Sequence, residues 1–272
     1  MPAHLKASAN LKWLFTELPF EARFEAAAEN GFTAVEYASP YEHTAISLRQ
    51  LLEANDLQQI LINTPAGEPG SPERAGAACL PGAGHIFRDQ VHRALDYAAE
   101  LDCGLVHVMA GIRPPHVSHD RALGTYLDNL GWAAERAVTG GVRLVLEAIN
   151  HTDRPGHFLE TQEMAADIVS ALGGDALGVL FDVYHCAVSQ GDVVARLRKL
   201  QPWVAHVQVA DLPHRGEPGT GKVPWESVFD QLRGANYTGW IGCEYRPVAD
   251  TAGGLSWLSR FGVGQQSSPA RR

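Results

Sequence analysis

Four apolar runs in the second half of the chain each end on a carboxylate or amide side chain. Three of the runs end on Glu147, Asp182 and Glu244, and the fourth ends on Gln208. Neighbouring strands of a barrel lie ~4.8 Å apart, so residues at the ends of consecutive strands converge on one point. The active sites of such barrels are built at the carboxyl ends of the strands. We therefore expect these four side chains to meet in one site.

Three carboxylates gathered in one place repel one another and lose hydration when buried, so they need a compensating positive charge. A divalent cation is the simplest source of that charge. Carboxylate and amide ligands without cysteine favour Mg²⁺ or Mn²⁺ over a structural Zn²⁺. The alternative for any one acid is that it caps a following helix or pairs with an arginine. Four such residues at matching strand ends favour the metal site.

The elements that must position these residues alternate along the whole chain. Short β-branched and apolar runs predict eight strands, at Leu5–Ala9, Ala34–Tyr37, Gln59–Asn63, Leu105–Met109, Arg143–Ile149, Leu177–Val183, Val204–Val209 and Trp240–Tyr245. Amphipathic stretches predict helices between and after them, at Phe20–Glu29, Ser47–Ala54, His85–Leu101, Arg121–Val138, Thr161–Ala171, Val193–Leu200, Trp225–Leu232 and near Leu255–Phe261. Eight repeats of strand and helix predict a single (β/α)₈ barrel.

An open doubly wound sheet is the competing fold. It would place a glycine-rich nucleotide-binding turn after the first strand, whereas residues 10–13 read Asn-Leu-Lys-Trp. The pattern therefore favours the barrel, with one domain over residues 1–264 and a polar, disordered tail at 265–272.

Composition excludes several classes of function. The 272 residues carry 22 Lys and Arg against 31 Asp and Glu, a net charge of −9, which disfavours nucleic acid and anionic lipid. No apolar stretch approaches the ~18 residues of a membrane span, and no secretory signal opens the chain. Four widely spaced cysteines suggest neither a disulfide framework nor a zinc ribbon. We expect a cytoplasmic protein with a small-molecule substrate, which also allows a homo-oligomer.

The longest stretch without periodicity, residues 64–84, is rich in proline and glycine. Loops of this length in compact domains are usually functional, and this one is a candidate lid that would bring Arg74 to the carboxylate of a substrate. A simple surface insertion is the alternative.

Around the four strand ends the sequence resembles the hydroxypyruvate isomerase family, which belongs to the xylose isomerase-like barrels. The resemblance runs from about residue 5 to residue 262 and is carried by six blocks, Asn10–Phe20, His107–Gly111, Leu146–Asn150, Phe181–Cys186, His206–Ala210 and Gly242–Pro247. It implies a divalent metal, Mg²⁺ or Mn²⁺, held by Glu147, Asp182, Gln208 and Glu244. It also implies that Glu147 and Glu244 exchange the proton that interconverts hydroxypyruvate and tartronate semialdehyde.

The chemistry fits that implication. Moving a proton between adjacent carbons passes through an enediolate, whose negative charge a cation stabilises, and two facing carboxylates can remove and return the proton. Close relatives act on the longer 2-oxo-tetronates by the same step.

Four further residues are candidates for binding the substrate. His185 follows Asp182 by three residues, and Arg246 follows Glu244 by two, so each can reach the site. A histidine without a role and a surface ion pair are the respective alternatives. His107 and Trp13 follow apolar strands and could equally be core residues.

The chain departs from the family at two places. Glu147-Ala148-Ile149-Asn150 replaces a usual Glu-Pro-Ile-Asn, and the loop Pro213–Lys222 differs from the usual Gly-Arg-His-Glu-Pro-x-Thr-Gly-Glu. Because loops set substrate choice, these changes leave three rivals open on the same scaffold. They are a 2-oxo-tetronate isomerase, a ketose 3-epimerase, in which histidine usually stands at the position of Gln208, and a non-catalytic sugar-acid binding protein. An apurinic endonuclease is disfavoured by the negative charge.

Overall fold

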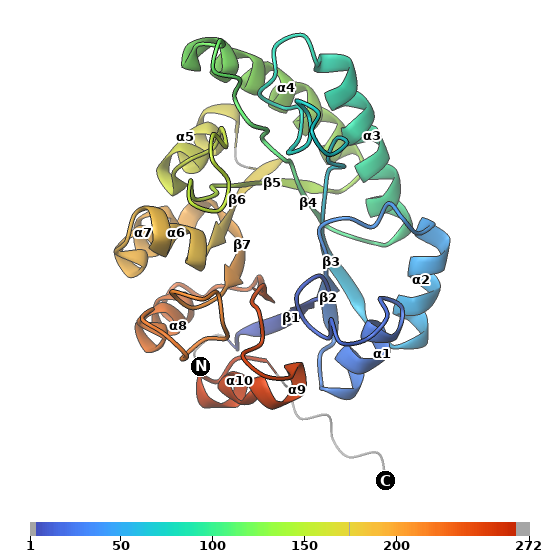
Figure 1. Cartoon of the computed structure of the whole chain (residues 1–272), viewed down its shortest axis with the longest axis vertical. Coiled ribbons are helices and arrows are strands. Elements are labelled where there is room, and N and C mark those ends of the chain that lie inside the picture. The colour runs from blue at the N-terminus through green and yellow to red at the C-terminus, as the bar shows by residue number, and fades with distance from the viewer. Residues whose placement is uncertain (1–3, 174, 265–272) are drawn as a thin grey trace.

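The computed structural model describes residues 4–173 and 175–264, which form a closed barrel of eight parallel strands in the order β1 to β8. Helices surround the strands (Figure 1), and the predicted (β/α)₈ barrel is confirmed. The strands are β1 Lys6–Asn10, β2 Ala34–Glu36, β3 Gln58–Asn63, β4 Leu105–His107, β5 Arg143–Glu147, β6 Leu177–Asp182, β7 Val204–Val209 and β8 Trp240–Cys243.

The helices follow the strands in turn. They are α1 Ala22–Glu29, α2 Ala45–Ala54, α3 Gly84–Glu100, α4 His119–Thr139, α5 Gln162–Leu172, α6 Val183–Ser189, α7 Val193–Leu200, α8 Trp225–Gly234, α9 Thr251–Gly254 and α10 Ser256–Arg260, with a 3-10 turn at Gln201–Trp203. Helix α6 was not predicted, and the single helix predicted near Leu255–Phe261 is the pair α9 and α10. None of the helices in the described chain is long and apolar enough to cross a membrane.

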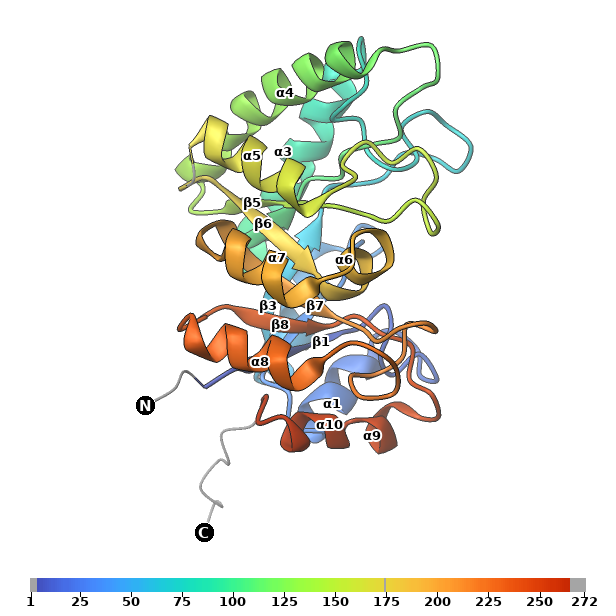
Figure 2. The same ribbon diagram turned by 90° about the vertical axis from the view of Figure 1, so that its left-hand side faces the viewer.

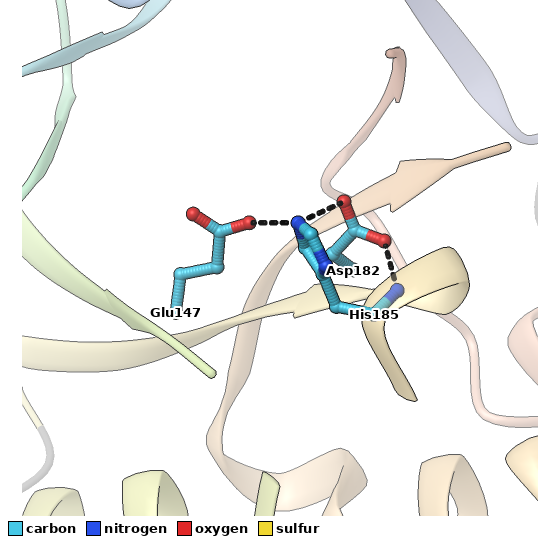
Figure 3. A group of neighbouring side chains, drawn as sticks. All are labelled: Glu147, Asp182 and His185. Carbon is cyan, nitrogen blue, oxygen red and sulfur yellow. Dashed lines mark hydrogen bonds and ion pairs between the residues drawn. The ribbon is translucent and has the colours of Figure 1, made fainter. Parts of the chain in front are cut away.

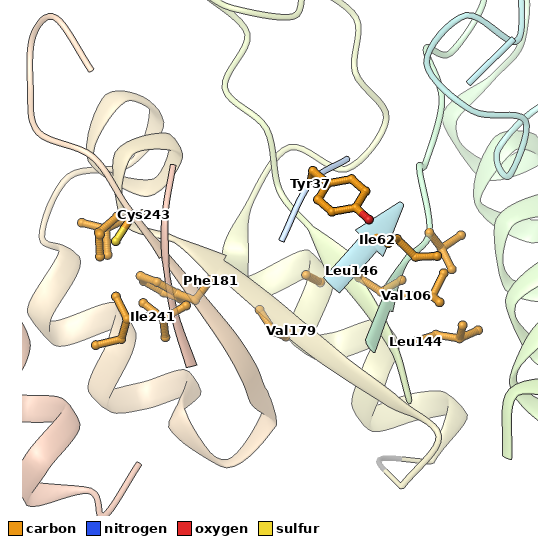
Figure 4. Close-up of a cluster of buried hydrophobic side chains, with 14 of the residues drawn as sticks. Tyr37, Ile62, Val106, Leu144, Leu146, Val179, Phe181, Ile241 and Cys243 are labelled. Atoms are coloured by element: carbon orange, nitrogen blue, oxygen red, sulfur yellow. The ribbon is translucent and has the colours of Figure 1, made fainter. Parts of the chain in front are cut away.

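Alternation along the strands separates two cores. Side chains that point outward, such as Leu144, Val179 and Ile241, pack in one large cluster that also includes residues of the surrounding helices (Figure 4). The residues between them point into the barrel, where Val145 and Leu180 belong to a second, small cluster. The same alternation turns polar residues at or near several strand ends inward, above this inner layer, among them Glu36, Glu147 and Gln208.

Five predicted strands are too long at their carboxyl ends: β2 and β6 by one residue, and β4, β5 and β8 by two, with β8 ending at Cys243 instead of Tyr245. β4 ends at His107 instead of Met109, and β5 ends at Glu147 instead of Ile149. The backbone leaves the sheet there because loop contacts replace strand pairing: the Met109 amide donates to Thr64 Oγ1 at 3.1 Å, and the Ile149 amide donates to the Leu159 carbonyl at 3.1 Å. The apolar residues past the strand ends are buried in loops that cover the barrel mouth.

The long loops that follow the strands project from one end of the barrel (Figure 2). The loop at residues 64–84 is anchored at this end by the backbone bond from Cys79 to the Ala110 carbonyl, 2.9 Å, and by Asn129, which donates to the Ala78 carbonyl at 2.8 Å. Gly76 has a φ of +99°, and a Cβ there would lie 2.1 Å from the Met109 carbonyl oxygen, so only glycine allows this approach. The second half of the loop is therefore packed in place.

Candidate active site

Glu147, Asp182 and His185 form a buried group at the carboxyl ends of β5 and β6 (Figure 3). One ligand atom of each lies within 4.8 Å of the others. His185 Nε2 is 3.7 Å from Glu147 Oε1 and 3.9 Å from Asp182 Oδ2. Two oxygens and an imidazole nitrogen at this spacing suit a divalent cation.

Helix α6 explains how His185 reaches this group. Asp182 is the last residue of β6 and the N-cap of α6, and its Oδ1 accepts a hydrogen bond of 2.9 Å from the His185 amide. A residue three places after the cap lies one turn later on the same side of the helix. The imidazole is fixed on its other side, where its Nδ1 lies 2.7 Å from Asn150 Nδ2. The sequence predicted His185 as a substrate ligand, whereas its position groups it with the candidate metal ligands.

Gln208 and Glu244 line the same pocket as Glu147, so the structure brings all four predicted metal ligands to one end of the barrel. The pocket also includes Trp13 and His107 and has a volume of about 120 Å³. That is well below the ~300–1,000 Å³ of sites for drug-sized ligands. His107 Nδ1 lies 3.6 Å from Glu147 Oε2, so His107 is part of the pocket and not only a core residue. The dimensions suit a substrate of few carbon atoms.

Arg215 lies among the carboxylates, although the sequence did not single it out. Its Nη2 is 2.5 Å from Glu244 Oε1 and 3.6 Å from Asp182 Oδ2. The guanidinium stacks over Trp13 and Tyr184, with its carbon 4.6 Å and 4.8 Å from the two ring centroids. The signal that could have found it is its place in the loop after β7, at the functional end of the barrel.

The pKa values of the two pocket glutamates, Glu147 and Glu244, are raised above their ordinary range. Burial, reinforced by the charges of Glu244 and Asp182, raises the pKa of Glu147 well above its usual range. Burial also raises the pKa of Glu244 to about 7, although Arg215 opposes the rise. Desolvation lowers the pKa of His107 to about 3 and lowers that of His185. Both imidazoles are therefore neutral at pH 7 and supply no charge.

The charge and donor balance fits a divalent cation. Three carboxylates, Glu147, Asp182 and Glu244, converge here, and Arg215 pairs with two of them. A divalent cation would favour the ionised form of all three acids and balance their mutual repulsion. Gln208 provides independent support for a cation, because its buried Oε1 has no hydrogen-bond partner among the described residues. An unpaired buried oxygen costs about 1–3 kcal/mol, and a cation would satisfy it.

Glu36 is a second buried acid that the sequence did not single out. It ends β2, points into the barrel beneath Gln208, and is entirely buried. Burial alone would raise its pKa, but the neighbouring His206 and the hydrogen bonds it accepts outweigh that effect and lower the pKa. Glu36 is thus an ionised carboxylate fully supplied with donors.

Two predicted substrate ligands do not reach the pocket. Arg246 is exposed on the rim, with its guanidinium carbon 5.4 Å from the Trp13 ring centroid, because the chain leaves the sheet after Cys243 and no longer alternates as a strand. Arg74 is exposed and donates to the Ser71 carbonyl within its own loop at 3.1 Å. Neither is among the described residues that line the pocket.

Comparisons with known proteins agree with this geometry. Residues 24–261 match the family described as xylose isomerase-like TIM barrel. The chain is 42% identical to 2-oxo-tetronate isomerase of Cupriavidus necator, covering 93% of this chain and 97% of the relative. It is 37% identical to hydroxypyruvate isomerase of Escherichia coli, covering 94% and 99%.

Solved structures show the same fold. A structure titled AP endonuclease, family 2, from Brucella melitensis matches with a TM-score of 0.90 at 35% identity, covering 96% of this chain and 99% of that one. A D-psicose 3-epimerase from Clostridium cellulolyticum matches with a TM-score of 0.74 at 18% identity, covering 89% and 85%, which shows the fold alone. The chain belongs to the hydroxypyruvate isomerase and 2-oxo-tetronate isomerase family of xylose isomerase-like barrels, whose members interconvert aldose and ketose forms of sugar acids.

Proposed function

We propose that the protein is a divalent-metal-dependent isomerase that converts hydroxypyruvate to tartronate semialdehyde through an enediolate. The observation that carries the proposal is the placement of Glu147 and Glu244 at one small pocket, together with Asp182, His185 and Gln208. Both glutamates have raised pKa values, which suits groups that accept and donate a proton near neutral pH.

Glu147 and Glu244 form the proton-transfer pair. One carboxylate removes a proton from the hydroxymethyl carbon of the bound substrate, and the other returns a proton to the former carbonyl carbon. The hydroxyl proton passes in the same direction, from the oxygen of the former hydroxymethyl carbon to the oxygen of the former carbonyl carbon, so the reaction is balanced and needs no other reactant. Arg215, bonded to Glu244 Oε1, fixes that carboxylate and adds positive charge where the enediolate forms.

The cation, Mg²⁺ or Mn²⁺, would be held by the oxygen ligands Glu147, Asp182, Gln208 and Glu244, with His185 as a further nitrogen ligand. The bound cation would stabilise the negative charge of the enediolate oxygens. His107 lies beside Glu147, and its neutral ring can donate or accept a hydrogen bond at a substrate oxygen.

A second candidate substrate is a 2-oxo-tetronate, one carbon longer. It is favoured by the higher identity to the relative named 2-oxo-tetronate isomerase, 42% against 37% for the relative named hydroxypyruvate isomerase. The pocket volume of about 120 Å³ suits small acids of either length.

Other chemistries have less support. The 3-epimerases share the fold at identities near one fifth. The relative titled AP endonuclease is more similar, but a net charge of −9 disfavours a DNA substrate.

Turnover of a substrate panel tests the proposal. The metal-stripped protein is supplied with Mg²⁺ or Mn²⁺ and offered hydroxypyruvate, 2-oxo-tetronates and ketoses, with a chelated sample as the control. We expect metal-dependent conversion of hydroxypyruvate. Conversion of the 2-oxo-tetronates alone would identify a 2-oxo-tetronate, and not hydroxypyruvate, as the substrate. Epimerisation of the ketoses, or no reaction with any compound of the panel, would contradict the proposed isomerase activity.

A further inference from the structure

Four side chains from two strands, β1 and β7, are hydrogen-bonded to the buried carboxylate of Glu36. Its Oε2 accepts from Ser8 Oγ at 2.8 Å and lies 2.8 Å from His206 Nε2. Its Oε1 accepts from Asn10 Nδ2 at 3.1 Å and from Gln208 Nε2 at 2.7 Å. None of these groups is needed by the strand pairing of the barrel, and a buried charge is costly unless it is paired in this way.

The barrel makes room for Glu36 at one defined place. Gly242 on β8 pairs with both Ser8 and Gln208, and a Cβ at this glycine would lie 2.4 Å from Glu36 Oε1. The carboxylate therefore occupies the volume of a missing side chain, with its oxygens fixed relative to β1, β7 and β8.

A carboxylate only accepts hydrogen bonds, whereas an amide has one donating and one accepting end. Contact with Glu36 Oε1 therefore forces Gln208 to turn its NH₂ group toward Glu36. This leaves Gln208 Oε1, which has no partner among the described residues, for the pocket.

The same oxygen orients Asn10. Asn10 Nδ2 donates to Glu36 Oε1 and also to Glu244 Oε2 at 3.1 Å, while its Oδ1 accepts from the Lys12 amide at 3.1 Å. A flipped Asn10 would place its oxygen against both carboxylates. One buried acid thus sets the direction of two amides that reach the site.

We propose that Glu36 is a positioning residue that fixes Gln208 with its oxygen toward the metal position and Asn10 with its NH₂ toward Glu244. The inference rests on the proposed function for the role of the metal, but the amide orientations themselves do not depend on it. Glu36 touches neither substrate nor metal in this account and acts through Gln208 and Asn10.

Glu36→Gln tests the proposal, because it keeps the shape and replaces one acceptor with a donor. If the new NH₂ group faces Gln208 and Asn10, it favours the flipped form of both amides. If it faces Ser8 and His206, both amides still lose their charged acceptor. Ser8→Ala is the matched control, since it removes a hydrogen bond from Oε2 and leaves Oε1 unchanged. The double variant Glu36→Gln, Gln208→Glu restores an oxygen at the pocket and keeps the overall charge of the unaltered chain.

Two measurements distinguish a change in the orientation of the Gln208 and Asn10 amides from the loss of the Glu36 charge. The first follows the side-chain amide resonances of Gln208 and Asn10 by NMR in the metal-free protein. We expect both to lose the downfield shift of an amide bonded to a carboxylate in Glu36→Gln and to keep it in Ser8→Ala. The second is the affinity for Mn²⁺ by calorimetry. We expect a loss of about tenfold or more in Glu36→Gln, less than about twofold in Ser8→Ala, and recovery of most of the loss in the double variant.

Unchanged amide resonances in Glu36→Gln would overturn the proposal, even if the Mn²⁺ affinity falls, because the loss would then reflect charge alone. An Mn²⁺ affinity within twofold of the unaltered protein would also overturn it. If the unaltered protein binds no Mn²⁺, the proposed metal-dependent function fails, and the resonances still decide the role of Glu36.

Discussion

Two buried glutamates at opposite sides of the barrel mouth have opposite environments. Glu36, at the end of β2, is met by four side-chain partners, and its pKa is lowered. Glu147, at the end of β5, has two neutral histidines at 3.6 and 3.7 Å as its side-chain contacts in the described chain, and its pKa is raised. When the environments of two acids shift their pKa values in opposite directions, the acid with a full set of hydrogen-bond donors supports the structure. The acid that lacks donors is available for proton transfer.

The same contrast extends to the two halves of the barrel. In the late half, the Glu147 carboxylate has only the two histidine contacts and Gln208 Oε1 has no partner in the described chain, whereas Asn10 and Glu36, at the ends of β1 and β2, bond to each other. The late half is therefore expected to act on the substrate, and the early half is expected to hold the late half in position.

Removing a catalytic carboxylate tests this division with the largest expected effect. Glu147→Gln and Glu244→Gln should each lower kcat by about 10³-fold or more while the circular dichroism spectrum is unchanged, since general acid–base catalysis alone contributes ~10²–10⁴-fold. Exposed Glu160, in the loop after β5, provides a matched control as Glu160→Gln, which should keep nearly full activity. Turnover within tenfold of the unaltered enzyme in either pocket variant would remove that glutamate from the proton pair.

The group of Glu147, Asp182 and His185 predicts a smaller loss at His185. His185→Ala should weaken Mn²⁺ binding by about 10–100-fold, because the variant loses a candidate nitrogen ligand and the hydrogen bond to Asn150. His151→Ala, an exposed histidine of the adjacent loop, is the control. Unaltered metal affinity combined with a raised KM would return His185 to the substrate-binding role expected from the sequence.

Arg215 lies inside the pocket and Arg246 lies outside it on the rim, so substituting them should lower kcat/KM to different extents. Arg215→Met should lower kcat/KM by about 10–100-fold, because hydrogen bonds to charged groups contribute ~1.5–3 kcal/mol. Arg246→Met should change it by less than about threefold, since Arg246 is exposed. Steady-state kinetics on the best substrate compares them. Equal losses, or a larger loss for Arg246, would place the substrate nearer the rim.

The smallest effect concerns stability. Gly242→Ala should lower the free energy of unfolding by about 1–3 kcal/mol, because its Cβ would lie 2.4 Å from the Glu36 carboxylate. Gly131→Ala, in helix α4 with no atom within 4 Å of the added Cβ, should leave stability unchanged or slightly raised. Urea unfolding measures both. An undiminished stability of Gly242→Ala would show that Glu36 is not held as tightly as its contacts suggest.

Much of the fold could be predicted from the sequence, because apolar alternation and strand-end chemistry are local signals. Glu147, Asp182, Gln208 and Glu244 were found as inward residues at four strand ends. Helix α6 was missed because its seven residues continue the apolar run of β6 with no break between them. Strand ends were extended too far where buried loop residues, such as Val108 and Ile149, are as apolar as the strand before them.

The rest of the site depends on contacts across the barrel, which no local pattern records. In the sequence, Glu36 is an ordinary polar residue at the end of a three-residue strand. Its role depends on the hydrogen-bond donors that β1 and β7 place around it in the folded barrel. Arg215 lies in a loop, and its guanidinium packs on the rings of Trp13, after β1, and of Tyr184 in α6, whereas the sequence spacing favoured Arg246. Spacing predicts which residues share a face only while the chain remains a strand.

The central claim is that two carboxylates move a proton between adjacent carbons, and isomerisation in D₂O tests it most directly. The enzyme with Mn²⁺ or Mg²⁺ converts hydroxypyruvate in D₂O, and the product is examined by proton NMR and mass spectrometry. Proton exchange through Glu147 and Glu244 predicts one solvent deuterium at the former carbonyl carbon. A product with hydrogen at that carbon and no deuterium would indicate transfer without solvent exchange, as hydride or through one shielded base, and would contradict the account of two exchanging carboxylates.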